Sequence, residues 1–206
     1  MALKIYGVAR SRAFRTLWMA KELGLDYEHV KIDFATGETR TAAHLALNPN
    51  GHIPVIDDDG FILWESMAIN LYLAKRYGAG KLYPTRLEDE ARAWQWSFWG
   101  MTEVERPVLT ALFNRAILPE NERDPAAADA AEKTLAQPLR VLDGVLGHSA
   151  NLLGENFSVA DLNVASILAW ARPAQIDMSA LPKVAEWLKN CAERPAARAA
   201  RQLQRE

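Results

Sequence analysis

Three short segments of the 206-residue chain carry groups suited to binding a charged or peptide-like ligand. Ser11 follows the first predicted strand and precedes the first predicted helix, where a hydroxyl and the helix amides can donate hydrogen bonds to an anion. The backbone of Ile53 is held extended by Pro54 and can pair with another extended chain. Glu65 and Ser66 begin a predicted helix and suit an ammonium and a carboxylate, respectively.

Each of these segments also has a purely structural interpretation. Ser11 and Ser66 are good helix-capping residues, and Ile53-Pro54 is compatible with an ordinary strand entry. Taken one at a time, the three segments therefore leave binding and capping both open.

Other kinds of chemistry find little support in the sequence. There is no Gly-rich phosphate loop, no His-Glu-x-x-His and no serine flanked by glycines. Cys191 is the only cysteine, so this chain alone forms no disulfide and no cysteine-based zinc site, and a reducing compartment such as the cytoplasm is expected. Four histidines lack the spacing of metal ligands, and we expect no metal: His29, His44, His52 and His148.

The charge balance excludes two classes of partner. Lys and Arg number 24 against 26 Asp and Glu, so the chain lacks the basic field that nucleic acid or anionic lipid requires. No run of about 18 apolar residues is present to span a membrane. We therefore expect a soluble protein with small-molecule ligands.

The first third of the chain changes its hydrophobic period repeatedly, which is typical of a mixed α/β domain. The predicted elements are a strand over residues 2–8, a helix over 13–23 closed by Gly24, a strand over 27–33, a short helical run, a turn at 48–51, a hairpin of 53–56 with 61–64, and a helix over 65–77 closed by Gly78.

A Gly- and Pro-rich segment over residues 79–86 reads as a linker, so we expect one domain over 1–78 and another over 87–206. Only helical patterns follow it. The first predicted helix covers residues 87–117 and bends at Pro107, and the second covers 125–146. A third helix is capped by Ser158 and ends before Pro173, and the last two cover 181–190 and 196–204.

Together the segments resemble a cytosolic glutathione S-transferase of the serine type, similar to phi and theta members. The resemblance rests on Ser11 with Arg15 four residues later, on Asn48-Pro49-Asn50-Gly51-His52-Ile53-Pro54-Val55, and on Trp64-Glu65-Ser66-Met67-Ala68-Ile69. Ser158-Val159-Ala160-Asp161 is similar to the capping box of the family's second domain. The resemblance implies a thioredoxin-like N-terminal domain followed by an all-helical domain.

The family pattern implies a role for each matching residue. Ser11 would hold the glutathione thiolate, and Ile53, before a cis Pro54, would pair with the cysteinyl unit. Glu65 and Ser66 would bind the γ-glutamyl end. Basic or polar groups toward the glycyl carboxylate would be Arg40 and His52. Two departures are His44, where an aromatic apolar residue is common, and Arg12, where zeta-like isomerases have a cysteine.

The resemblance also implies a pocket for a hydrophobic electrophile. The residues expected to line it are Val8, Ala9, Arg12, Trp96, Trp99 and Phe113. Trp94 and Phe98 fall on another face of the same predicted helix, so one aromatic stripe belongs to the core and the other to a cleft or a second subunit.

The activity implied by the resemblance is transfer of the glutathione thiolate to an electrophile by a cytoplasmic homodimer. Glutathione is the co-substrate, and no metal is needed. Two alternatives are a glutathione-dependent reductase of disulfides or peroxides, and a protein of this fold that binds without turnover.

Overall fold

The computed structural model describes residues 3–205, which form two compact units. One unit comprises the chain up to Tyr83 together with the segment from Arg194 onward, and the other runs from Pro84 to Glu193. By its contacts the last helix thus groups with the first unit. The domain boundaries at 78 and 87 stay predictions.

A four-stranded mixed sheet forms the centre of the first unit. Its strands are β1 (Leu3–Tyr6), β2 (Tyr27–Val30), β3 (Val55–Asp58) and β4 (Phe61–Trp64), in the spatial order β2-β1-β3-β4. β1 pairs parallel with β2, whereas β3 pairs antiparallel with both β1 and β4. The order of elements confirms the predicted mixed α/β, thioredoxin-like domain.

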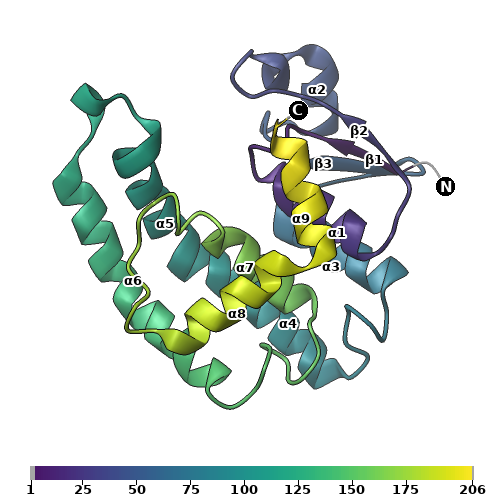
Figure 1. Cartoon of the computed structure of the whole chain (residues 1–206). Helices are drawn as coiled ribbons and strands as arrows, with labels where there is room; N and C mark the ends of the chain where they lie inside the picture. The colour runs from purple at the N-terminus through teal and green to yellow at the C-terminus, as the bar shows by residue number, and fades with distance from the viewer. Residues whose placement is uncertain (1–2, 206) are drawn as a thin grey trace. The chain divides into compact units, whose positions relative to one another are not determined.

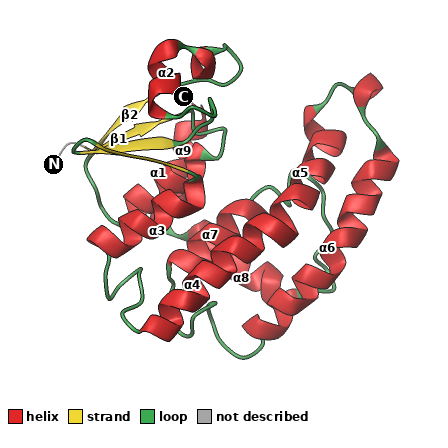
Figure 2. Cartoon of the chain, turned by 180° about the vertical axis from the view of Figure 1, so that it is seen from behind, coloured by secondary structure: helices red, strands yellow, loops and turns green. Residues whose placement is uncertain are grey.

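Helices cover the sheet of the first unit on both faces (Figure 1). α1 (Ala13–Glu22) and α3 (Ser66–Tyr77) pack together on one face, and the short α2 (Ala42–Leu47) lies on the other, as the view from behind also shows (Figure 2). The core under α1 and α3 is made of fully buried aliphatic side chains from strands and helices, among them Ile5, Leu17, Ile56, Ile69 and Leu73.

The last helix, α9 (Pro195–Gln202), packs along α1. Arg194 donates from Nε and Nη2 to the two carboxylate oxygens of Glu22, at 2.6 and 2.8 Å. Trp18 Nε1 donates to the same carboxylate at 2.9 Å. A bidentate pair of this kind fixes orientation as well as distance, so the end of the chain is held against its first helix.

The second unit is helical throughout. Its helices are α4 (Leu87–Trp99), α5 (Arg106–Leu112), α6 (Pro125–Leu146), α7 (Val159–Leu168) and α8 (Pro182–Glu193). The Asp124 side chain caps α6 by accepting from Ala127 N at 3.0 Å. No helix in the part of the chain from residue 3 to 205 has the length and apolarity needed to cross a membrane.

The predicted helix over 87–117 is interrupted rather than simply bent. Two wide, π-helical turns, over Gly100–Glu105 and Phe113–Ile117, flank α5, and Pro107 lies in the first turn of α5. Proline has no N–H to donate and crowds the carbonyl one turn earlier, so the preceding turn widens. The first of the two π-helical turns therefore precedes the proline.

Asp161 holds the second unit together at its centre. Its carboxylate accepts hydrogen bonds from Leu152 N, Ser158 N, Ser158 Oγ and Trp187 Nε1, all between 2.8 and 3.0 Å. This confirms the predicted capping box and extends it to a tryptophan of α8. Burial raises the pKa of the Asp161 carboxyl, and these hydrogen bonds oppose the rise.

We expect Asp161→Ala to lower the free energy of unfolding by roughly 2–5 kcal/mol, because the substitution leaves several buried donors without an acceptor. Urea denaturation followed by tryptophan fluorescence measures the change. Asp177→Ala is the control, since among the described residues the side chain of this exposed aspartate bonds only to Ser179, and its backbone bond to Glu132 does not depend on the side chain. A loss no larger than that of the control would show that the Asp161 hydrogen bonds contribute little.

Candidate glutathione-binding site

The register of the sheet brings the three segments singled out from the sequence to one edge. Tyr6, at the end of β1, lies opposite Val55 at the start of β3, and Val55 lies opposite Trp64 at the end of β4. The residues that follow β1, precede β3 and follow β4 therefore meet. These residues include Val8, Ala9, Ser11, Ile53, Pro54, Glu65 and Ser66.

Gly7 allows the turn before α1 to approach β3 closely. Its φ of +128° lies in a region that L side chains rarely adopt, and a Cβ at this position would lie 2.9 Å from the Cβ atoms of both Ala13 and Ile53. Only glycine fits such a contact. The start of α1 is thereby packed against Ile53.

The half-buried Ser11 hydroxyl is engaged at the start of α1. Its Oγ donates to the Val8 carbonyl at 2.7 Å and accepts from Ala13 N at 3.1 Å. The Ser11 hydroxyl therefore bonds within the turn that precedes α1, whose N-cap residue is Arg12. A bond from Ser11 to a ligand sulfur requires its single proton to leave the Val8 carbonyl.

The arginines near Ser11 have different surroundings. Arg10 forms an ion pair with Asp33, and Arg12 is exposed. Arg15 is buried, and its Nη1 donates to Ser66 Oγ at 3.2 Å. The sequence indicated Arg15 only as part of the family motif, because nothing in its local pattern shows that its partner lies 51 residues away.

The Ile53–Pro54 peptide bond is cis. Within residues 3–205, neither the N–H nor the C=O of Ile53 has a hydrogen-bond partner. The preceding carbonyl, of His52, accepts from Asn48 Nδ2 at 2.9 Å and contacts His44 Nε2 at 3.0 Å. His44 thus replaces the usual aromatic residue with a buried donor that fixes this turn.

Arg40 and His52 both have exposed side chains beside the turn at residues 48–51. Arg40 Nη1 donates to the Asn50 carbonyl at 3.2 Å. Gly51 has a φ of +64°, and a Cβ there would lie 2.7 Å from Arg40 Nη1. The turn therefore carries a cation at its surface, next to the segment that leads to Ile53.

Glu65 and Ser66 join β4 to α3. Glu65 has a φ of +73°, which costs a non-glycine residue roughly 1–3 kcal/mol and is concentrated at functional sites. Its side chain is exposed, whereas Ser66 is buried at the first position of α3. This junction presents a carboxylate, a hydroxyl and the free amides of a helix start within two residues.

The aromatic residues of the predicted electrophile pocket belong to the second unit. Trp96 is buried and Trp99 half-buried, with their rings edge to face and centroids 5.0 Å apart. Phe113 is exposed at the start of a π-helical turn. Trp94 and Phe98 are exposed on the other face of α4, as the spacing predicts.

One further contact at the site comes from the end of the chain. Gln204 Nε2 donates to the Ala9 carbonyl at 3.1 Å, in the turn that carries Ser11. No sequence signal indicated this contact, because it joins residues 195 positions apart.

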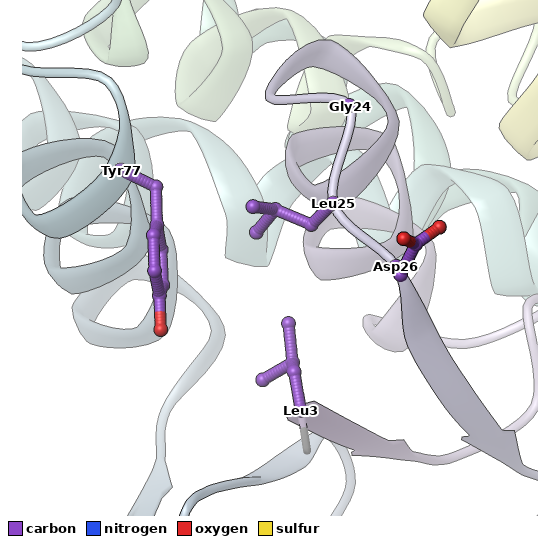
Figure 3. Close-up of a pocket in the computed structure, with 5 residues that line it drawn as sticks. All are labelled: Leu3, Gly24, Leu25, Asp26 and Tyr77. Carbon is purple, nitrogen blue, oxygen red and sulfur yellow. The ribbon is translucent and has the colours of Figure 1, made fainter. Parts of the chain in front are cut away.

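A separate pocket of about 400 Å³ lies at the start of β1, at the opposite end of that strand from the turn with Ser11 (Figure 3). Its lining residues are Leu3, Gly24, Leu25, Asp26 and Tyr77. The Tyr77 hydroxyl donates to the buried Asp58, and burial with this bond raises the pKa of Tyr77 to about 12. The pocket contains no predicted site residue.

Among residues 3–205 there is also no cluster of His, Cys, Asp and Glu able to hold a metal ion.

Comparisons with known proteins agree with this geometry. Residues 1–75 match the family model "Glutathione S-transferase, N-terminal domain" and residues 104–195 match "Glutathione S-transferase, C-terminal domain". Glutathione S-transferase GstB of Escherichia coli is 32% identical over 189 residues, which cover 89% of each chain. Glutathione S-transferase 3 of Zea mays is 34% identical over 94% of this chain and 90% of that protein.

The solved structures include the theta class glutathione S-transferase of Xanthomonas axonopodis pv. citri with glutathione bound. It superposes with a TM-score of 0.90 at 30% identity and covers 96% of each chain. With relatives above 30% identity along nearly its whole length, and with both domain models matched, the chain belongs to the glutathione S-transferase family.

Proposed function

We propose that this protein is a glutathione transferase that adds the thiolate of glutathione to hydrophobic electrophiles. The observation that carries the proposal is the meeting of Ser11, Ile53 and Ser66 at one edge of the sheet. Support comes from relatives named glutathione S-transferases along nearly the full length of the chain.

Glutathione would bind as an added extended segment beside β3. The unpaired N–H and C=O of Ile53 suit the backbone of the cysteinyl unit. Ser66 and the first amides of α3 suit the γ-glutamyl carboxylate, and Glu65 suits its ammonium group. At the other end, Arg40 and His52 would attract the glycyl carboxylate.

Catalysis requires the bound thiol to lose its proton near neutral pH. A free thiol has a pKa near ~8.5, and only its thiolate is a good nucleophile. The Ser11 hydroxyl is too weak an acid to act as base, but as a donor it stabilises the anion. A charge-assisted bond of roughly 1.5–3 kcal/mol lowers the thiol pKa by about one to two units.

The thiolate must compete with the Val8 carbonyl for the Ser11 proton. A charged acceptor forms a bond about twice as strong as a neutral carbonyl does, so the hydroxyl turns toward sulfur once glutathione binds. The bond from Ala13 N to Ser11 Oγ uses a lone pair and can persist through this rotation.

We expect Ser11→Ala to lower turnover roughly ten- to hundredfold and to raise the pKa of bound glutathione thiol, with little change in its Kd. The thiolate absorbance of the complex, titrated with pH, measures the pKa directly. Ser11→Thr keeps a hydroxyl and is the matched control. Equal turnover in Ser11→Ala would identify another donor, such as a backbone amide or Arg12.

Rates with an aryl halide, a mixed disulfide and an organic peroxide test the class of reaction. We expect the aryl halide to react fastest. Faster turnover of the disulfide or peroxide would assign a reductase, and binding of glutathione without turnover of any of the three would assign a binding protein.

We also propose that the protein is a cytoplasmic homodimer. Phe61 and Trp64 are exposed at the two ends of β4, and Trp94 and Phe98 are exposed one turn apart on α4. Neighbouring exposed aromatics are typical of protein interfaces. A second copy of the chain is the occupant that the family resemblance implies.

The variant Trp94→Glu/Phe98→Glu is expected to shift the sedimenting mass from that of a dimer to that of the 23.0 kDa chain, because it places charges in a desolvated contact. Val141→Glu, at a single exposed apolar residue of α6, is the control and should leave the mass unchanged. A double variant that sediments as the wild type does would place the interface elsewhere.

A further inference from the structure

Arg15 is a cation enclosed in the first unit. It lies in the first turn of α1, it is 1% exposed, and its Nη1 donates to Ser66 Oγ. Enclosing a guanidinium carries a large desolvation cost, and a well-packed apolar side chain of similar size often stabilises a core more. Stability is therefore a weak reason for an arginine here.

The contact fixes the hydrogen-bonding state of Ser66. A guanidinium has only N–H donors, so Ser66 Oγ must accept, and its own proton is left for a different acceptor. Within the described residues, Ser66 Oγ has no other hydrogen-bond partner. Because the first amides of α3 also lack partners within the helix, hydroxyl and amides together suit a carboxylate.

The two serines of the site are thus in opposite states. The Ser11 proton is engaged with the Val8 carbonyl, whereas the Ser66 proton is available. Of these two serines, Arg15 bonds to Ser66. Arg15 therefore affects the end of the site that would bind the γ-glutamyl unit rather than the end that would bind the sulfur.

We propose that Arg15 is a positioning residue that orients the Ser66 hydroxyl as a donor to the α-carboxylate of the γ-glutamyl unit, and so makes the site selective for peptides that carry this carboxylate. The inference rests on the proposed binding of glutathione. Arg15 acts through Ser66 and does not touch the reacting atoms.

The test compares two peptides, glutathione and γ-aminobutyryl-cysteinyl-glycine, which lacks only the α-carboxylate. Calorimetry gives both Kd values, and we expect the wild-type protein to bind glutathione at least about tenfold more tightly. Arg15→Met should reduce this ratio severalfold, and Arg15→Lys, which keeps a charged donor, should keep most of it. Arg140→Met, an exposed arginine of α6, is the matched control.

A double-mutant cycle separates action through Ser66 from general damage. Once Ser66→Ala is present, Arg15→Met should change the ratio no further. In Arg15→Met alone, the pKa of the bound thiol should stay as in the wild type. If the substitution disturbed the whole site, this pKa would change as well. Near-UV circular dichroism reports folding, and Arg15→Leu, which also lacks an N–H donor, takes the place of a poorly folded Arg15→Met.

Three results would overturn the inference alone: a wild-type protein that binds both peptides equally, a folded Arg15→Met or Arg15→Leu with the full ratio, or fully additive losses in the cycle. A wild-type protein that binds neither peptide would overturn the proposed function as well.

Discussion

The antiparallel register of β3 is the constraint on which the site depends. Because Val55 pairs with Tyr6 on one side and with Trp64 on the other, three loops that are far apart in sequence end at the same sheet edge. A shift of one residue would turn every side chain of β3 to the opposite face and remove Ile56 from the core under α1 and α3. The hydrophobic core and the binding edge are therefore specified by the same pairing.

In the proposed function, different polar groups at this edge serve the binding of glutathione and the activation of its thiol. Ser66 receives a hydrogen bond from a buried cation and keeps its proton, which suits recognition of a carboxylate that is charged at all times. Ser11 holds its proton on a neutral carbonyl, which suits a group whose charge develops only when a thiol ionises. In this proposal the neighbours of each serine decide whether it binds a permanent anion or one that forms only when the thiol ionises.

Much of the fold was predictable from the sequence, because strand alternation, helix caps and glycine turns are local signals. Ser158 with Asp161 and Asp124 before Pro125 each marked a helix start correctly. Contacts between residues far apart in the sequence were not predictable: the partner of Arg15 depends on how α1 packs on α3, and the contact of Gln204 depends on how α9 packs on α1. The π-helical turns around α5 were also missed, since periodicity does not distinguish a wide turn from a regular one.

The bond between Glu22 and Arg194 closes a loop of 172 residues and makes the first unit discontinuous in sequence. During synthesis the ribosome releases α1 long before it makes α9, so the Trp18 and Glu22 side of α1 stays uncovered until residues 194–202 have been made. A piece of this protein cut after Tyr83 would lack that cover permanently. Assembly of the first unit consequently waits for a segment that is made after the whole second unit, although the strands of the first unit are made before it.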